Sequence, residues 1–415
     1  MQNEKDRLIT AQLIEWKSYI YFSLPPCRIF NSLENKYVVS IVKINNEKKT
    51  FEKSIVSARL TIYSIAVKVL TILLFPIEVF SIVWVIAYFS TNVVTVMVQI
   101  ISVIVRIVTL FLTFIDHFWR RHEFGIILNE ILELCKKFDI FKQRNTEVMI
   151  LLLLKLLSFV LLMSTFLSTI YVTKTFTSLF TCIVWFYEAH IQAVVFLIGI
   201  YFYIFLLLVI KLYTYLNGEL DKIIRRTKNT LQDNRISVQT QCDLSDDLDN
   251  LTQCYSNTVY LCQRISKLFG IQNLLLIFLS FVDNIIVFFY SLINIWIINV
   301  FNDMNIIFVL IVTTLIFDTF LLIFVADKVT KSGKRFKKTL EDNFIYLSSL
   351  DVRLERSIET SLLISKKQNL QIEVCGMFSL NNGFASAMTS ATASNLLVLV
   401  QFYRTLDKVS WGSYL

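Results

Sequence analysis

Runs of apolar residues long enough to cross a lipid bilayer recur along this chain, and they restrict its fold more than any other feature. Seven runs stand out, at 62–87, 92–115, 148–171, 184–210, 270–292, 304–326 and 383–402. A helix needs roughly 20 apolar residues to cross the ~30 Å of hydrocarbon in a bilayer. Because the runs lack the period-two alternation of a β-barrel, helices must satisfy the backbone hydrogen bonds. The sequence therefore predicts an all-α polytopic membrane protein with seven transmembrane helices.

The overall composition supports this fold class. Hydrophobic residues make up 55% of the chain and charged residues only 17%, and the mean hydropathy is +0.61. These values exclude an ordinary water-soluble fold. The sequence contains no glycine-rich phosphate loop, catalytic-triad spacing or His–Glu metal motif. We therefore expect neither an enzyme with catalytic residues nor a metal or cofactor site.

The distribution of basic residues predicts the orientation of the chain. The segments at 1–58, 116–147, 211–269 and 327–373 hold thirty-three Lys and Arg residues, whereas the segments between the other spans and the tail hold three. Positive residues concentrate on the cytosolic side of a membrane protein. The N-terminus is therefore predicted to be cytosolic and the C-terminus extracellular, the reverse of a G-protein-coupled receptor. This bias also explains the net charge of +8 without any nucleic-acid partner.

Long helical extensions are predicted on the cytosolic side. Apolar residues recur at helical spacing from Leu244 to Leu268, directly before the fifth span, and again from Leu340 to Leu362. An apolar stripe outside the bilayer must pack against something, either within one subunit or between subunits. The predicted regions are 1–61 (cytosolic), 62–210 (helices 1–4), 211–269 (cytosolic extension), 270–326 (helices 5 and 6), 327–373 (cytosolic anchor), 374–402 (re-entrant turn and pore-lining helix 7) and 403–415 (extracellular tail).

Ionisable residues inside the predicted spans are costly and are therefore candidates for a structural or functional role. Lys155 lies within about two turns of the cytosolic face, so its side chain is expected to reach towards that surface. Arg106 and Asp318 lie in the inner halves of their spans and could pair across the helix bundle, in a structural role.

The final helix carries the most informative motif. It reads Ser394-Asn395, five aliphatic residues, then Gln401-Phe402, and it follows a Gly-x-Phe-x-x-Asn sequence that begins at Gly376. This pattern resembles the C-terminal end of the insect gustatory receptor family, which typically has Thr-Tyr, five apolar residues and Gln-Phe; Asn395 replaces the usual Tyr. The resemblance implies a ligand-gated cation channel, with the extensions of four subunits joined in a central anchor.

The same helix has side chains suited to a pore. Small residues in its first half allow close helix packing, and Val398 and Gln401 share one face. Aliphatic side chains arranged in a ring around a pore can close it, and neutral amide side chains can replace some of the water around a passing cation. The resemblance places Gln401 and Phe402 at the pore and Val398 at its gate. The alternative from the sequence alone is that Gln401 lies at the outer membrane surface.

A cluster of aromatic and polar residues is a candidate ligand site in the outer half of the membrane. Such a mixture suits a small polar ligand such as a sugar, although an interfacial aromatic belt or helix–helix hydrogen bonds would also explain parts of it. The resemblance implies ligand binding in this outer half, between the second and sixth helices. The candidate residues are Trp185, Tyr187, Glu188, His190, Gln192, Asp283, Asn284 and Tyr290.

The sequence thus predicts a gustatory receptor that acts as a tastant-gated, non-selective cation channel in the plasma membrane of sensory neurons. Its expected partners are a sugar or bitter tastant, permeant cations, the lipid bilayer and other subunits of a homo- or heterotetramer. Three alternatives stay open: an odorant receptor of the sister family, a membrane transporter, and a signalling receptor that is not a channel.

Overall fold

The described part of the chain is almost entirely helical in its computed structural model. The structure describes residues 76, 93–138, 140, 145–172, 179–232, 238–296, 303–344, 351–368 and 370–412. Its helices and strands are α5 (Val93–Lys137), α6 (Thr146–Val172), α7 (Leu179–Gln232), α8 (Val238–Leu268), α9 (Gly270–Trp296), α10 (Asp303–Phe344), α11 (Val352–Lys367), β1 (Glu373–Val374), β2 (Phe378–Ser379) and α12 (Asn382–Gly412).

The chain divides into two compact units. One consists of Met1–Phe80 and Leu132–Arg144, and the other of Ser81–Ile131 and Asn145–Leu415. The fold and the sites described below lie in the second unit.

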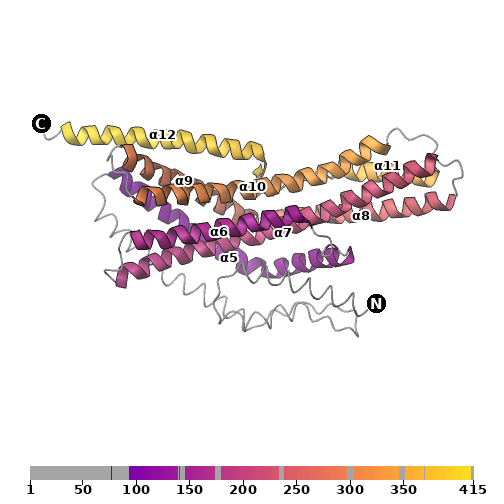
Figure 1. The fold of residues 1–415 in the computed structure, drawn as a ribbon, viewed down its shortest axis with the longest axis horizontal. Coiled ribbons are helices and arrows are strands. Elements are labelled where there is room, and N and C mark those ends of the chain that lie inside the picture. The colour runs from indigo at the N-terminus through magenta and orange to yellow at the C-terminus, as the bar shows by residue number, and fades with distance from the viewer. Residues whose placement is uncertain are drawn as a thin grey trace. The chain divides into compact units, whose positions relative to one another are not determined.

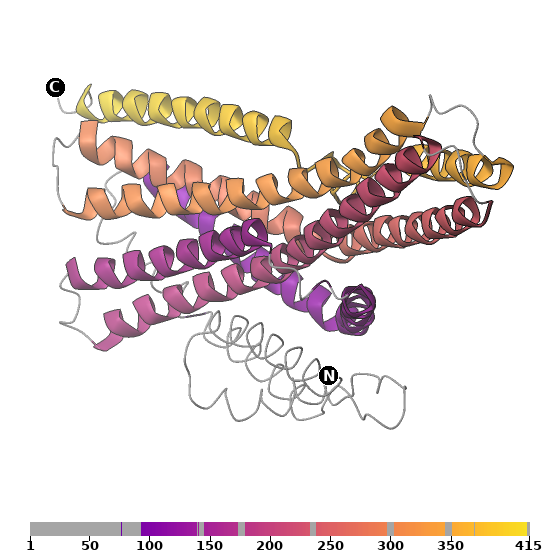
Figure 2. The ribbon, with the colours of Figure 1, turned by 45° about the vertical axis from the view of Figure 1, so that its right-hand side comes forward.

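The membrane-type helices of this unit pack around α10, which contacts α6, α7 and α9 (Figures 1 and 2). Five helical segments of the described chain are long and apolar enough to cross a membrane: Thr146–Thr165, Ala193–Asn229, Gly270–Ile293, Val309–Phe344 and Asn382–Thr405. Each of them overlaps one of the last five of the seven spans that the sequence predicts, although the second and fourth segments extend 18 or more residues past the predicted ends.

The first two predicted spans are not among these five segments. The span at 62–87 lies outside the described residues, apart from Pro76, which is helical. The span at 92–115 falls within α5, which continues without interruption to Lys137. This segment is helical as predicted, but it is not one of the five segments named above.

Two of the long helices continue past the apolar core and pack with α8 and α11. We call α8, α11 and the parts of α7 and α10 beyond residues 210 and 326 the extension bundle. In this bundle α8 packs against α7 and α11, and α10 also contacts α11 (Figure 1). The predicted stripe on α8 is confirmed, because all its members are buried: Leu244, Leu248, Leu251, Tyr255, Val259, Cys262, Ile265 and Leu268.

The second predicted stripe is confirmed in part, because four of its described members are buried and the last, Leu362, is half-buried. Leu340 and Phe344 on α10 and Leu354 and Ile358 on α11 are all buried. The stripe does not follow one continuous helix, because α10 ends at Phe344 and α11 begins at Val352. Leu347 and Leu350 lie outside the described residues.

Aromatic stacking and buried hydroxyl pairs hold the extension bundle together. Tyr255 of α8 stacks on Phe336 of α10, with ring centroids 4.2 Å apart and planes 10° apart. At the seam between α8 and α11, two pairs of hydroxyls share hydrogen bonds, at 2.7 Å for Ser245–Ser357 and 2.6 Å for Thr252–Ser361. Because buried hydroxyls are costly without partners, these pairs favour one register of α11 on α8.

Candidate functional site

The helix α12 begins at a defined cap. The side-chain oxygen Oδ1 of Asn381 accepts a hydrogen bond of 2.9 Å from the backbone N–H of Phe384, which satisfies one of the free N–H groups at the helix start. The Phe384 ring in turn stacks on Phe378 of β2, with centroids 4.4 Å apart. The Gly-x-Phe-x-x-Asn motif therefore joins the β-hairpin to the start of α12.

Several polar side chains of α12 bond to its own backbone. Thr389 and Thr392 donate to the carbonyl oxygens four residues earlier, each at 2.9 Å, and Asn395 Nδ2 donates to Ala391 O at 2.8 Å. Such local bonds lower the cost of placing a polar side chain in a membrane helix. Asn395, which replaces the tyrosine typical of the motif, is exposed.

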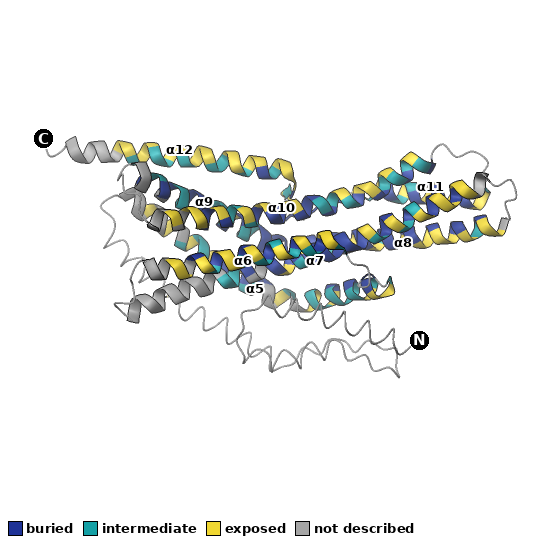
Figure 3. Cartoon of the chain, in the orientation of Figure 1, coloured by how far each residue is buried: buried dark blue, intermediate teal, exposed yellow. Residues whose placement is uncertain are grey.

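Unlike the other membrane-type helices, α12 buries little of its surface. Only 6% of the residues in its apolar stretch are buried, compared with 69% in the apolar stretch of α7, and Figure 3 shows exposed residues along most of the helix. It contacts α9 and, to a lesser extent, α10. One contact is the edge-to-face pair of Tyr403 and Phe289, with centroids 6.0 Å apart.

The predicted pore residues lie on the part of α12 that this packing leaves open. Val398 is 47% exposed and Phe402 is 60% exposed, and Gln401 is also exposed. Four exposed polar residues lie on the same face of α12, spaced three or four positions from Val398 or from one another: Ser390, Ser394, Gln401 and Thr405. Val398 is the apolar residue in the middle of this row.

A β-hairpin anchors the start of α12 to the end of α8. The Oγ of Ser266 donates to Glu373 O and accepts from Glu373 N at 3.1 Å. At the tip of the hairpin, Cys375 and Gly376 have φ angles of 52° and 69°, the pattern of a type I′ turn. A Cβ at Gly270 would lie only 3.3 Å from the Cys375 backbone nitrogen, so glycine permits this close contact.

Side chains of α5 also form hydrogen bonds with the junction of α8 and α9. Arg120 Nη1 donates to the last carbonyls of α8, at 2.8 Å for Lys267 O and 3.5 Å for Leu268 O. The Arg120 guanidinium also pairs with Asp116 at 2.9 Å, and Asp116 accepts from Gln272 of α9 at 3.3 Å. This cluster connects α5, the junction and, through Ser266, the hairpin before α12.

The predicted ligand residues fall into two groups. Trp185, Tyr187, Glu188, His190 and Gln192 lie in the first turns of α7, where the structure describes the backbone but not their side chains, and the Tyr290 side chain is likewise outside the description. Asp283 and Asn284 of α9 are both buried. In the described part of the chain, the Asn284 Oδ1 atom has no hydrogen-bond partner.

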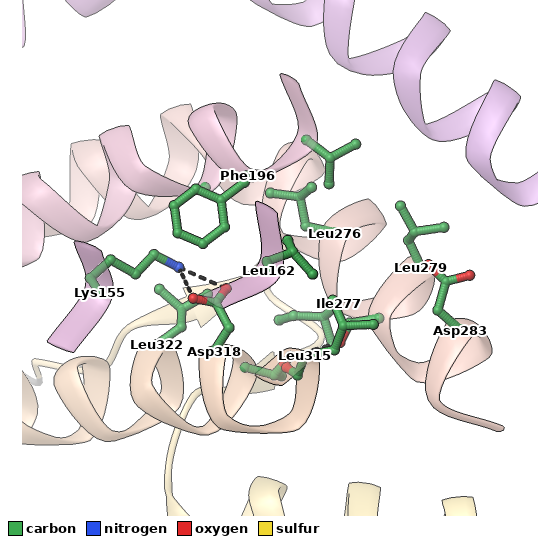
Figure 4. A pocket seen from close by; sticks show the side chains of 14 residues that line it. Lys155, Leu162, Phe196, Leu276, Ile277, Leu279, Asp283, Leu315, Asp318 and Leu322 are labelled. Atoms are coloured by element: carbon green, nitrogen blue, oxygen red, sulfur yellow. Dashed lines mark hydrogen bonds and ion pairs between the residues drawn. The ribbon is translucent and has the colours of Figure 1, made fainter. Parts of the chain in front are cut away.

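The ionisable residues inside the spans do not pair as the sequence analysis expected. Arg106 does not pair with Asp318; its Nη2 lies 3.4 Å from Asp283 Oδ1. Lys155 does not extend to the membrane surface but is 2% exposed, and its Nζ binds both Asp318 oxygens at 2.7 and 2.8 Å (Figure 4). Sequence reasoning missed this pair because the rotations of α6 and α10 about their axes decide which side chains meet.

Among the described residues, no group of three or more His, Cys, Asp or Glu side chains could hold a metal ion.

Comparison with known proteins identifies the family. Residues 37–405 match the 7tm chemosensory receptor family. The chain is 33% identical over 167 residues to the "Gustatory receptor for bitter taste 93a" of Drosophila melanogaster, covering 40% of this chain and 38% of the relative. It is 26% identical over 208 residues to the "Putative gustatory receptor 36b" of the same organism, covering 48% of this chain and 53% of the relative. The chain thus matches about half or less of the length of these relatives.

The fold is similar to that of a solved chemoreceptor. The olfactory receptor OR5 from Machilis hrabei aligns with a TM-score of 0.55 at 14% identity, covering 92% of this chain and 99% of that one. The same receptor in complex with eugenol aligns with a TM-score of 0.51 at 14% identity, covering 86% and 93%. At this identity the similarity concerns the fold alone, whereas the family match covers most of the sequence. The chain belongs to the 7tm chemosensory receptor family.

Proposed function

We propose that this chain is a gustatory receptor that acts as a subunit of a tastant-gated, non-selective cation channel in the plasma membrane of sensory neurons. One observation carries the channel part of the proposal: α12 is long enough to cross the membrane, yet only 6% of the residues in its apolar stretch are buried by the chain itself. An uncovered face with a row of hydroxyls and an amide is poorly suited to lipid tails. It is well suited to water and to copies of the same helix around an axis.

In this proposal the chain crosses the membrane seven times, with a cytosolic N-terminus, an extracellular C-terminus and a cytosolic extension bundle. Four subunits assemble, and their α12 helices line the pore. Val398 forms the aliphatic gate, and Gln401 and Phe402 form its outer neighbours. The exposed positions of all three residues on one uncovered surface support this assignment.

The tastant is proposed to bind in the outer half of the bundle, among the eight residues that the sequence analysis names. The buried Asn284 Oδ1 supports this location, because a buried acceptor with no partner in the described residues is costly unless another group donates to it. The relative named as a bitter-taste receptor favours a bitter compound over a sugar. Ligand binding opens the pore if the ligand has higher affinity for the open state than for the closed state.

Whole-cell recording from cells that express this chain, alone and with other gustatory subunits, tests the proposal. Perfusion with bitter compounds and with sugars should identify a ligand that evokes a cation current, and Gln401→Ala should alter ion permeation without reducing surface expression. Saturable substrate uptake without single-channel steps would instead indicate a transporter. A ligand that binds the purified protein but evokes no current with any co-subunit would overturn the channel mechanism.

A further inference from the structure

A row of exposed basic residues lies on α10, just past the end of its predicted membrane span. Lys331, Lys334, Arg335 and Lys338 are all exposed, and their spacings of three, four and seven residues place them on one side of the helix. The exposed fraction of the side chain is 65% for Lys331 and 69% for Arg335. Clusters of four or more Lys and Arg residues immediately after a membrane helix are typical of sites for anionic lipids.

The neighbouring helix α7 adds a fifth positive charge to the same side. The two helices pack side by side (Figure 2), and two hydrogen bonds between them join residues 115 positions apart, so they run in the same direction. Arg335 of α10 lies 4.0 Å from Asp221 of α7. The exposed Arg225 follows Asp221 by about one turn, as Lys338 follows Arg335, so Arg225 and Lys338 lie at the same level. We call these four residues of α10 and Arg225 the basic surface.

Carboxylates neutralise only part of the basic surface. Asp327 pairs with Lys331 at 2.5 Å, and Asp221 pairs with Arg335 at 4.0 Å. Among the described residues, the other three members of the basic surface have no ion-pair partner. Three positive charges on the surface are therefore available to an anionic ligand.

The other end of the extension bundle has the opposite charge. Asp243, Asp246, Asp247 and Asp249 are exposed on the half of α8 that lies farther from α9. The positive-inside bias explains why basic residues are cytosolic. It does not explain why five of them from two separate parts of the chain share one surface near the membrane. That arrangement favours a specific anionic partner.

The distance from the bilayer indicates the class of lipid. With the predicted span of α10 ending at residue 326, Lys331 lies roughly 8 Å and Lys338 roughly 18 Å beyond the hydrocarbon, at ~1.5 Å per residue. The headgroup layer on each side of a bilayer is only about 5–8 Å thick. A phosphate at the level of the ordinary headgroups therefore lies near Lys331 alone. A headgroup that carries further phosphates away from the membrane is needed to reach the other members.

We propose that the basic surface binds a phosphoinositide, an inner-leaflet lipid whose inositol ring carries several phosphates. Each phosphate accepts charge-assisted hydrogen bonds from the ammonium groups, and Arg335 and Arg225 offer two parallel donors each. The bound lipid bridges α7 and α10 where both leave the membrane. The inference uses the cytosolic position of the extension bundle from the proposed function, but neither ion conduction nor a tastant.

Native mass spectrometry of the purified full-length chain in detergent, titrated with phosphatidylinositol bisphosphate, tests the site. We expect a bound lipid whose apparent Kd is at least tenfold lower than that of phosphatidylserine. The variant Lys331→Gln/Lys334→Gln/Arg335→Gln/Lys338→Gln should weaken this binding at least tenfold. In detergent both sides of the protein are accessible, so a failure to bind overturns the site, whereas an error in the proposed topology or channel activity would leave the binding unchanged.

The matched control removes the same number of exposed basic charges from α11, in the variant Arg353→Gln/Arg356→Gln/Lys366→Gln/Lys367→Gln. This control keeps the net charge equal to that of the test variant, and it should bind the lipid within twofold of the unmodified chain. An equal loss in both variants would show attraction by net charge alone and would overturn the proposal.

Two further measurements keep the test decisive. If the quadruple variant of α10 has a lower thermal transition, Lys334→Gln/Lys338→Gln replaces it, because this change leaves both ion pairs intact; at least threefold weaker binding is then expected. Soluble inositol trisphosphate should bind at least tenfold more weakly than the lipid. Equal affinity for the two would assign the surface to a soluble phosphate and would contradict a membrane ligand, as would equal affinity for phosphatidylserine.

Discussion

The helices of the extension bundle and helix α12 all combine apolar residues with small polar ones. They differ in how many of their residues the rest of the chain covers. In the extension bundle, the whole apolar stripe of α8 is buried, and its hydroxyls pair across the seam with α11. Along α12, only 6% of the residues in the apolar stretch are buried. The first region completes its packing within one chain, whereas the second presents an uncovered helix for lipid, water or other subunits.

This difference indicates which region contributes most to the stability of the folded chain and which helix can move at lower cost. Buried stacking and hydrogen bonds stabilise the folded chain, but they also resist rearrangement. A helix that packs on one side only, against α9 and part of α10, can tilt at lower cost. The fold thus combines a tightly packed bundle with a less covered helix, a combination that suits the proposed gated pore.

The largest expected effect is in the extension bundle. Phe336→Ala removes a fully buried ring that stacks on Tyr255, and a Phe→Ala change in a core costs about 3–5 kcal/mol. The thermal transition of the purified protein should fall clearly. Val398→Ala, at an exposed position of α12, should leave the transition of the single chain almost unchanged. Equal losses for both variants would break the contrast between the two regions.

Breaking the buried ion pair should have the next largest effect. Lys155→Met leaves Asp318 without its cation, and removing one partner of a buried pair costs about 3–5 kcal/mol. We expect a value near the lower end, because the Asp318 side chain is 25% exposed. The double variant Lys155→Met/Asp318→Leu should recover most of the loss, which a thermal-shift double-mutant cycle measures. Additive losses would show that the pair does not stabilise the membrane helices.

A smaller effect is expected where the hairpin contacts the start of α9. In Gly270→Ala the new Cβ lies 3.3 Å from the Cys375 backbone nitrogen, and overpacking of this kind costs about 1–3 kcal/mol. Gly218→Ala, with no atom within 4 Å of its Cβ, should be neutral or slightly stabilising. If the two variants have the same thermal transition, the hairpin does not anchor α12 in the way described.

The smallest perturbation is chemical labelling of the native cysteines. Cys375 in the hairpin is exposed, whereas Cys262 in the extension bundle is buried. Burial raises the pKa of the Cys262 thiol to about 12, so almost no thiolate forms near neutral pH. Burial also raises the pKa of Cys375, so its labelling should accelerate as the pH rises. Mass spectrometry after maleimide treatment should find Cys375 modified well before Cys262; the reverse order would contradict the packing of α8.

The sequence predicted the features that depend on periodicity and length. The stripe from Leu244 to Leu268 indicates a buried helix face because its spacing alone defines that face. The membrane-length run before Gln401 likewise predicts α12. Neither pattern reveals that one helix is covered by its own chain and the other is not, because coverage depends on tertiary packing.

The ion pairs between helices could not be predicted from the sequence. Lys155, Asp318 and Arg106 each lie in a separate apolar run, and their partners depend on the rotation and depth of four helices. Cys375 illustrates a local failure of the same kind. The sequence predicts a turn from residue 374, but not the positive φ of Cys375, which is uncommon for a residue other than glycine. This φ belongs to the three-residue loop between the paired residues Val374 and Phe378.

Cysteine accessibility along α12 tests the pore assignment most directly. Val398→Cys and Gln401→Cys lie on the uncovered face, whereas Tyr403→Cys lies on the side that contacts Phe289 of α9. During ligand-evoked currents, a positively charged methanethiosulfonate reagent should block the first two variants and leave Tyr403→Cys and the unmodified chain unaffected. Block of Tyr403→Cys alone, or evoked currents that the reagent changes in none of the variants, would contradict a pore lined by the uncovered face of α12.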